Sequence, residues 1–488
     1  MRCARCSLMI LIAAVTCTSA EVKPNAIFTN HMVLQRDLPV KVWGTADDGA
    51  KIQVAINGQS AETTAAGGTW LVTLKPMPAG GPHELTIKGG NEIKLTDVLV
   101  GDVWVCGGQS NMDWDLGKLV KGGDTAEQYS KIVKEAGNFP QIRMIVAEKA
   151  PIAEKATDLK IIKGYNGSWQ VSSPTTAPLC SAVGYVFGLR LHQHLKVPIG
   201  LIDSNKGGSP VETWMSEEAL KAADCPVAPK RYYNGNIYPI LNFGIKGAIW
   251  YQGESNAKSV ASSMKYGKTF STMIQSWRKE WGQKDFPFLY VQLAAWEGRP
   301  TVNVTWPLLR ESQDKALALP NVGAALCIDK GCRKNIHPPY KISVSERLVL
   351  AARKHAYGED LVYSGPRYKS HKVDGAKIVV TFDHAGGGLK HMGFTMETTN
   401  IPGDKLVGFE VSADGAKYIA AEAKIQGKDQ VIVSSPEVPA PKHVRYAWTG
   451  FPSANLFNLE GLPAHPFRTD ETVPEEVQQK PRRPKKRK

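Results

Sequence analysis

A buried strand that runs into two glycines and a serine constrains this chain more than any other stretch. Residues 98–106 are mostly apolar, which predicts a strand inside a sheet. The glycine pair that follows allows a tight turn and close approach of other groups. Ser110 then stands between the amide side chains of Gln109 and Asn111. A serine at the carboxyl end of a buried strand lies where open α/β sheets bind ligands. An ordinary turn with a helix cap is the alternative interpretation.

The length and charge of the chain limit its class. A chain of 488 residues is too long for one hydrophobic core, so two or three domains are expected. The net charge of +14 is concentrated at the two ends of the chain, because two arginines among the first five residues and seven Lys/Arg at 480–488 supply nine of the positive charges. The rest of the chain is only mildly basic, and nucleic-acid binding is not expected.

The first twenty residues have the pattern of a secretory signal peptide. Two arginines precede an apolar run at 8–15, which is too short to span a bilayer, and small residues at 18–20 precede the expected cut. A lipid anchor on Cys17 is disfavoured because Thr16 is larger than the residue that usually precedes such a cysteine. No later stretch is apolar enough for a membrane helix, so we expect a secreted or periplasmic protein without an integral membrane segment.

Cysteine usage gives little evidence for a metal site. Five cysteines remain after the expected cut, and an odd number leaves at least one that is free or pairs between chains. The spacing of Cys327 and Cys332 allows a disulfide between them. None of the five belongs to a C-x-x-C pair, so a zinc site is not expected.

The hydrophobic pattern divides the chain into three parts. Residues 21–97 alternate apolar and polar positions between turn signals, which predicts a small β-sandwich domain. Helix and strand patterns alternate through residues 98–358, which predicts a parallel sheet flanked by helices. β patterning returns at 359–469, and the basic, proline-rich tail at 470–488 is expected to be disordered. The N-terminal β domain either binds sugars or packs on the middle domain; no stacked aromatic site is visible in its sequence, which favours packing.

Three further strand ends bear glycines or polar residues. A strand before residue 206 leads into Gly207 and Gly208, and a second strand leads into Gln252. His337 follows the last strand of the α/β region, in a loop. A serine hydroxyl is a poor nucleophile until a base accepts its proton. Because His337 follows that strand and comes after Ser110 in chain order, it is our candidate for the base.

These four blocks together resemble the sialate O-acetylesterase family of SGNH-type serine hydrolases. The blocks are G-G-Q-S-N-M at 107–112, the glycine-rich stretch at 200–210, W-Y-Q-G-E-S at 250–255 and I-H-P at 336–338, in the family's order. The likeness covers most of residues 22–469. It implies an α/β SGNH-hydrolase-like parallel-sheet catalytic domain with an N-terminal β-sandwich and an additional C-terminal β region.

The resemblance also implies an activity and roles for particular residues. It implies an exported serine esterase that removes O-acetyl groups from carbohydrates through an acetyl-enzyme, without a metal or organic cofactor. Ser110 would be the nucleophile and His337 the base. The amide of Ser110, an amide of Gly207 or Gly208, and the side chain of Gln252 would bind the oxyanion.

The sequence departs from the family at two positions near these residues. Many relatives carry an aspartate two or three positions before the histidine, where this chain has Asn335 and Lys334. Either Asp329 folds back as the orienting acid, or a backbone carbonyl replaces the acid and leaves a Ser-His dyad. Lys206 stands where the family often has tryptophan, which leaves the neighbouring amide unchanged but alters the surface that the substrate meets.

Substrate contacts and the exact sugar are left open by the sequence. Gln109, Asn111 and Glu254 are candidate substrate-binding residues, and Glu254 has a second interpretation as the cap of the next helix. The sialic acid part rests on the family name alone, since a fold does not fix a substrate. An acetylxylan or other polysaccharide acetylesterase is the alternative activity. A non-catalytic sugar-binding protein built on a degenerate hydrolase fold is the rival from another class.

Overall fold

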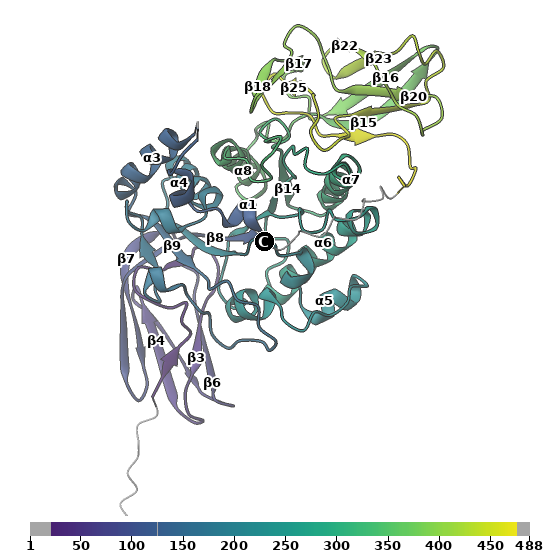
Figure 1. Ribbon diagram of the computed structural model, residues 1–488. Helices are drawn as coiled ribbons and strands as arrows, with labels where there is room; N and C mark the ends of the chain where they lie inside the picture. The colour runs from purple at the N-terminus through teal and green to yellow at the C-terminus, as the bar shows by residue number, and fades with distance from the viewer. Residues whose placement is uncertain (1–20, 124, 476–488) are drawn as a thin grey trace, which may run out of the picture.

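The molecule has three parts that follow one another along the chain (Figure 1). The computed structural model describes residues 21–123 and 125–475. The expected signal peptide, and residues 476–488 of the expected basic tail, lie outside the described residues. An N-terminal β region and a C-terminal β region, purple and yellow-green in Figure 1, lie at opposite ends of a central α/β domain. The predicted α/β class with an additional C-terminal β region is confirmed.

The central domain is built on a sheet whose strands are mostly parallel. Its order is β10 (Gln170–Val171), β9 (Ile142–Val146), β11 (Ile199–Asn205), β8 (Glu92–Gly108), β12 (Gly247–Tyr251), β13 (Phe288–Val291) and β14 (Val322–Ala325). Only β10 runs antiparallel to its neighbour. Strands that are buried on both faces have near-continuous apolar sequences, and β9, β11, β12, β13 and β14 are buried throughout.

Alternate side chains of these strands enter two different hydrophobic cores. On one face, Trp104 of β8 and Ile249 of β12 pack in a core with α4 (Ala182–Leu195) and α8 (Lys341–His355). On the other face, Trp250 packs in a core with α6 (Val260–Trp281) and α7 (Val302–Asp314). Because both faces are covered, ligands reach this sheet only at strand ends, which is the usual site in open α/β folds.

The N-terminal β region is continuous with the central sheet rather than separate from it. One small sheet has the order β1 (Lys23–Pro24), β3 (Val40–Thr45) and β6 (Thr69–Leu74). Of the other strands, β2 (Val33–Gln35) and β7 (Gly80–Lys88) pair with the first half of β8, and β4 (Lys51–Ile56) and β5 (Gln59–Thr64) extend the sheet beyond β7. The expected boundary between residues 97 and 98 therefore lies inside β8, and side chains of both parts share one hydrophobic core.

The C-terminal β region has its own core and two four-stranded sheets. The first sheet contains β15 (Arg367–Asp374), β16 (Lys377–Asp383), β23 (Gln430–Ser434) and β22 (Glu422–Gln426). The second contains β21 (Ile419–Ala420), β20 (Phe409–Ser412), β24 (His443–Tyr446) and β26 (Phe467–Arg468). Two short pairs, β17 (Leu389–His391) with β25 (Leu456–Asn458) and β18 (Phe394–Met396) with β19 (Thr399–Ile401), complete it.

Buried Arg310 of α7 connects this C-terminal region to the central domain. Its guanidinium donates to the backbone carbonyls of Thr449 and Gly450 at 2.8 and 3.0 Å, and also to carbonyls just after β13.

The five described cysteines, including Cys327 and Cys332, are all unpaired. Within the described residues, no helix combines the length and the apolar character that crossing a membrane requires.

Candidate active site

Ser110 lies at the centre of the sheet edge, at the first position of α1 (Ser110–Asp113). The preceding strand β8 is flanked by β11 and β12, so three of the four sequence blocks meet at adjacent strand ends. Gly108 has a φ of +136°, and a Cβ there would lie 2.3 Å from the carbonyl oxygen of Tyr251. Only glycine fits this position, and the close approach turns the chain sharply into α1.

His337 is brought to Ser110 from a distant part of the chain. Its Nε2 lies 2.8 Å from the Ser110 hydroxyl, within hydrogen-bond distance. The imidazole stacks on the ring of Trp114, with ring centroids 5.2 Å apart and planes inclined by 28°. The arrangement is that of an activated serine: if Nε2 carries no proton, it accepts the proton of the hydroxyl.

The expected orienting acid, Asp329, does not reach the imidazole. Its two carboxylate oxygens accept hydrogen bonds from Arg347 at 2.6 and 2.8 Å. Burial alone would raise the pKa of Asp329, but the bidentate Arg347 pair leaves it below its usual range. No described residue hydrogen-bonds the Nδ1 of His337. We therefore correct the expectation that Asp329 folds back to the ring; a strong guanidinium partner holds it elsewhere.

Asn335, which replaces the family's aspartate, binds the backbone rather than the ring. Its Oδ1 accepts a hydrogen bond from the backbone N–H of His337 at 2.9 Å. Tyr129 holds the next part of the same loop: its hydroxyl donates to the Pro339 carbonyl and accepts from the Lys341 backbone N–H at 2.8 Å. The position of the histidine is therefore set by its backbone and by the Trp114 ring.

Asn111 connects the block that contains Ser110 with the loop that contains His337. Its Nδ2 donates to the Ile336 carbonyl at 3.1 Å and to Glu254 Oε1 at 2.5 Å, and its Oδ1 accepts from Lys341 Nζ at 2.5 Å. An anionic acceptor on one side and a cationic donor on the other fix the orientation of the amide. We call Glu254, Asn111 and Lys341 the clamp. The sequence suggested substrate contacts for Asn111 and Glu254, whereas the structure directs both side chains to each other.

Both charged members of the clamp are removed from water. Burial lowers the pKa of Lys341 to about 8, although neighbouring Cys327 and Glu254 oppose that shift. Burial also raises the pKa of Glu254, and its Oε2 is buried without a hydrogen-bond partner among the described residues. Buried charges of opposite sign stabilise each other only as a set, so each one depends on the other.

The Gln252 side chain is used inside the protein. Its Nε2 lies within hydrogen-bond distance of three acceptors: Gln109 Oε1 at 3.1 Å, the Ser209 carbonyl at 3.3 Å and Asn256 Oδ1 at 2.7 Å. An amide nitrogen has two hydrogens, so none remains for another ligand. Gln109 Oε1 also accepts from the Ser255 backbone N–H at 3.0 Å, and Gln109 thus links the first and third blocks. We therefore correct the expectation that the Gln252 side chain donates to the oxyanion, because its amide hydrogens already have acceptors inside the protein.

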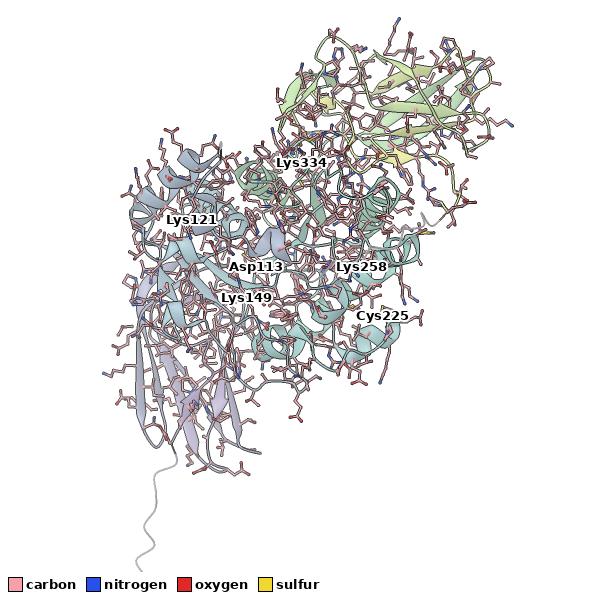
Figure 2. All side chains as sticks on the ribbon, in the orientation of Figure 1. Asp113, Lys121, Lys149, Cys225, Lys258 and Lys334 are labelled. Atoms are coloured by element: carbon pink, nitrogen blue, oxygen red, sulfur yellow. The ribbon has the colours of Figure 1, made fainter. Side chains whose placement is uncertain are left out.

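The two glycines after β11 differ in the availability of their amides. The Gly207 N–H donates to Asp113 Oδ2 at 2.9 Å, and the other oxygen of Asp113 pairs with Lys149. Figure 2 shows Asp113 in the middle of the molecule, with Lys149 close to it. The Gly208 N–H donates to no described residue, and neither does the Ser110 N–H at the start of α1. Of the two glycines, Gly208 is therefore the one with an unused donor.

The charges around His337 favour its neutral form. Burial lowers the pKa of His337 to about 4, and the cations of Lys341 and Lys118 add to this shift, while Asp113 opposes it. A neutral imidazole is the form that accepts a proton from a hydroxyl.

Sequence reasoning missed Trp114 and Lys341. Trp114 lies four residues after Ser110, and no sequence pattern marks it as part of the site. Lys341 stands at the start of an ordinary amphipathic helix.

Comparison with known proteins gives consistent matches. Residues 100–337 match the family described as "Carbohydrate esterase, sialic acid-specific acetylesterase". The sialate O-acetylesterase of Homo sapiens is 32% identical over 392 residues, covering 69% of this chain and 72% of that protein. The Rattus norvegicus sialate O-acetylesterase is 30% identical over 525 residues, covering 90% and 92%. The crystal structure of a carbohydrate acetylesterase from Xanthomonas citri superposes with a TM-score of 0.83 and 39% identity, covering 93% of this chain and all of that chain.

The clamp leads to a stability prediction. Glu254→Gln and Lys341→Met should each destabilise the protein by roughly 3 kcal/mol, because each leaves one buried charge without its partner. The double variant should recover most of that loss, since no unpaired buried charge remains. Thermal unfolding followed by circular dichroism measures all three variants.

The exposed pair of Glu217 and Lys221 on α5 (Glu217–Ala222) provides the matched control, with an Nζ–Oε1 distance of 2.8 Å. The same substitutions there should leave the melting temperature nearly unchanged. Losses that simply add in the double variant Glu254→Gln/Lys341→Met would contradict the coupling through Asn111.

Proposed function

The chain belongs to the sialate O-acetylesterase family of carbohydrate esterases, and we propose that this carboxylic-ester hydrolase removes O-acetyl groups from carbohydrates through Ser110 and His337. The observation that carries the proposal is the 2.8 Å contact between the Ser110 hydroxyl and His337 Nε2 at the carboxyl ends of the central strands. The expected signal peptide adds the proposal that the enzyme acts outside the cytoplasm.

The proposed reaction proceeds through two acyl transfers. The Ser110 oxygen attacks the acetyl carbonyl carbon while His337 Nε2 takes the hydroxyl proton. The bond between the carbonyl carbon and the sugar oxygen then breaks, and the imidazolium gives its proton to that oxygen. Water next attacks the acetyl-enzyme and gives a proton to Nε2. The bond to the Ser110 oxygen then breaks as the same proton returns to that oxygen, which restores the enzyme and releases acetic acid, which loses its remaining proton to water.

The backbone amides of Ser110 and Gly208 are the proposed donors to the oxyanion. Negative charge develops on the carbonyl oxygen only in the tetrahedral state, so donors that are fixed beforehand lower the barrier. Both N–H groups lack an acceptor among the described residues, whereas the Gly207 N–H is bonded to Asp113. The Gln252 side chain contributes in this scheme by holding Gln109, next to the nucleophile, through its 3.1 Å hydrogen bond.

The base is proposed to work without a carboxylate on its second nitrogen. Trp114 holds the ring plane, and the clamp together with Asn335 holds the backbone of the loop. Asp113 is the acidic group whose charge favours protonation of His337 during the reaction. The proposed centre is thus a Ser-His dyad with positional support. The sequence left open either Asp329 or a backbone carbonyl on the second ring nitrogen, and neither hydrogen-bonds it among the described residues.

The substrate class follows from the relatives only at a coarse level. The mammalian relatives are named for sialate, while the Xanthomonas citri protein, which is more similar in sequence, is named only as a carbohydrate acetylesterase. An acetylated polysaccharide therefore remains the second candidate substrate. A purely sugar-binding protein is disfavoured, because such a protein has no need for a serine and a histidine at hydrogen-bond distance.

Substitution of the two central residues tests the catalytic assignment. Ser110→Ala and His337→Ala should each lower kcat for p-nitrophenyl acetate by about 10⁴-fold or more, because the reaction loses its nucleophile or its proton acceptor. An organophosphonate probe should label Ser110 in the wild type, as read by peptide mass mapping. His83→Ala, in β7, is the control and should retain wild-type turnover. Labelling of another serine, with Ser110→Ala still active, would overturn the assignment.

The pH dependence of the reaction follows from the lowered pKa of His337. The base must be neutral, so kcat/KM should stay level from pH 8 to pH 5 and fall about tenfold per unit below the pKa of about 4. Stopped assays with circular dichroism at each pH separate titration from unfolding. Lys341→Met removes a cation and should move the midpoint to higher pH. A midpoint near 6.5 in the wild type would show that burial and Lys341 do not act on the base.

A further inference from the structure

A second cleft lies between the N-terminal β region and the central domain, away from Ser110. Its volume is about 780 Å³, which is within the range of about 300–1,000 Å³ that is usual for small-molecule sites. None of the residues that line it belongs to the four blocks. In Figure 1 the sheet that contains β3 and β6 lies at one end of the molecule, apart from α1.

The floor of the cleft is the outward face of the small sheet, and it is unusually apolar. Trp43 of β3 and Leu71 of β6 are a cross-strand pair on this face, and Leu71 is 39% exposed. Outward positions of a half-buried strand are normally polar, as Thr69 and Thr73 on the same strand are. The opposite wall contributes Tyr238, which is 37% exposed. The Lys155 ammonium lies 4.8 Å from the centre of that ring and holds it in place.

Polar groups without protein partners surround these apolar side chains. Thr45, Thr63, Thr64 and Asn242 are among the residues that line the cleft, and the side chain of none of them hydrogen-bonds another of the described residues. Hydroxyls and a carboxamide both donate and accept hydrogen bonds, as a ligand that carries many hydroxyl groups requires. Sugar rings present C–H faces and hydroxyl edges, and they fit a flat apolar floor with polar sides.

The charges in the cleft do not favour an ionic ligand. Asp158 Oδ1 already accepts from the backbone N–H groups of Ala26 and Leu159, and Glu280 accepts from the hydroxyls of Tyr233 and Ser276. Lys23 is the only lysine or arginine among the described residues that line the cleft, against these two carboxylates, so the lining has no excess of positive charge. A neutral ligand is therefore favoured over an anion.

We propose that this cleft binds a neutral stretch of a polysaccharide chain, separately from the hydrolysis of its acetyl groups. Trp43 and Leu71 would contact the faces of the sugar rings. The sugar hydroxyls would form hydrogen bonds with the three threonines and the asparagine named above. The inference rests on the proposed function for its ligand class, because a carbohydrate esterase meets polymers that carry many acetyl groups. Binding at the cleft keeps such a polymer near Ser110 while the site itself stays open.

The test uses the full chain carrying Ser110→Ala, so that the ligand is not altered during the measurement. Affinity electrophoresis and titration calorimetry with soluble acetylated xylan, galactomannan and polygalacturonate measure binding. At least one of the two neutral polymers should bind, and polygalacturonate should bind more weakly. Leu71→Asp in this background should weaken that binding at least tenfold, because it places a charge on the apolar floor.

Thr73→Asp is the matched control, since Thr73 is exposed on the same face of β6 and does not line the cleft. It should bind like the parent. In chains that retain Ser110, Leu71→Asp should raise KM for acetylated xylan or galactomannan without changing kcat/KM for p-nitrophenyl acetate. Failure of the esterase assignment would appear separately, as p-nitrophenyl acetate hydrolysis that survives Ser110→Ala.

Three results would overturn the proposal. The first is that neither neutral polymer binds. The second is that Leu71→Asp and Thr73→Asp bind alike. The third is sedimentation that shows a dimer which Leu71→Asp dissociates, because the floor would then be occupied by a second copy of the chain.

Discussion

The structure of the site depends on the carboxamide of Asn111, which links the segment that contains Ser110 to the loop that contains His337. Asn111 follows Ser110 in the chain, and its Nδ2 holds the carbonyl of Ile336, the residue before His337. The proposed nucleophile and the proposed base are therefore held in place relative to each other through one side chain. The two charges that orient this amide, Glu254 and Lys341, come from the loop after β12 and the start of α8. Three separate parts of the chain thus converge on one buried amide.

Burial and one of these charges, Lys341, also act on His337, the proposed base. A triad carboxylate would both orient the imidazole and stabilise its protonated form. Here the stacked ring of Trp114 and the pinned loop orient it, while burial and Lys341 keep it neutral. Position and charge, which a single aspartate provides in a triad, are supplied by different groups in this protein.

The apolar second half of β8 allowed much of the central domain to be predicted. The apolar run at 98–106 and the alternation after it predicted the buried strand and the parallel sheet, because burial on both faces requires such a sequence. The strand-end position also predicted a ligand site at Ser110, with Gly207 or Gly208 after a second strand, since parallel strands end at one edge. The boundary at 97 was not predicted, because the pattern does not show whether a strand joins one sheet or two. Arg36 crosses that boundary with a bidentate pair to Asp102 of β8.

The sequence by itself determined the fold class and the strand-end blocks, because strand burial and turn geometry are local properties. The pairing of Ser110 with His337 was expected from chain order and from the resemblance to the family. Only the tertiary structure decided which partner each polar group takes. Asp329 accepts hydrogen bonds from Arg347, and the Gln252 side chain donates to Asn256. Asp113 accepts the hydrogen bond of the Gly207 N–H. Only the tertiary structure places the exposed Leu71 in the same cleft as Tyr238. These contacts join residues far apart in the chain, and no local pattern records which distant donor or apolar surface folding brings within reach.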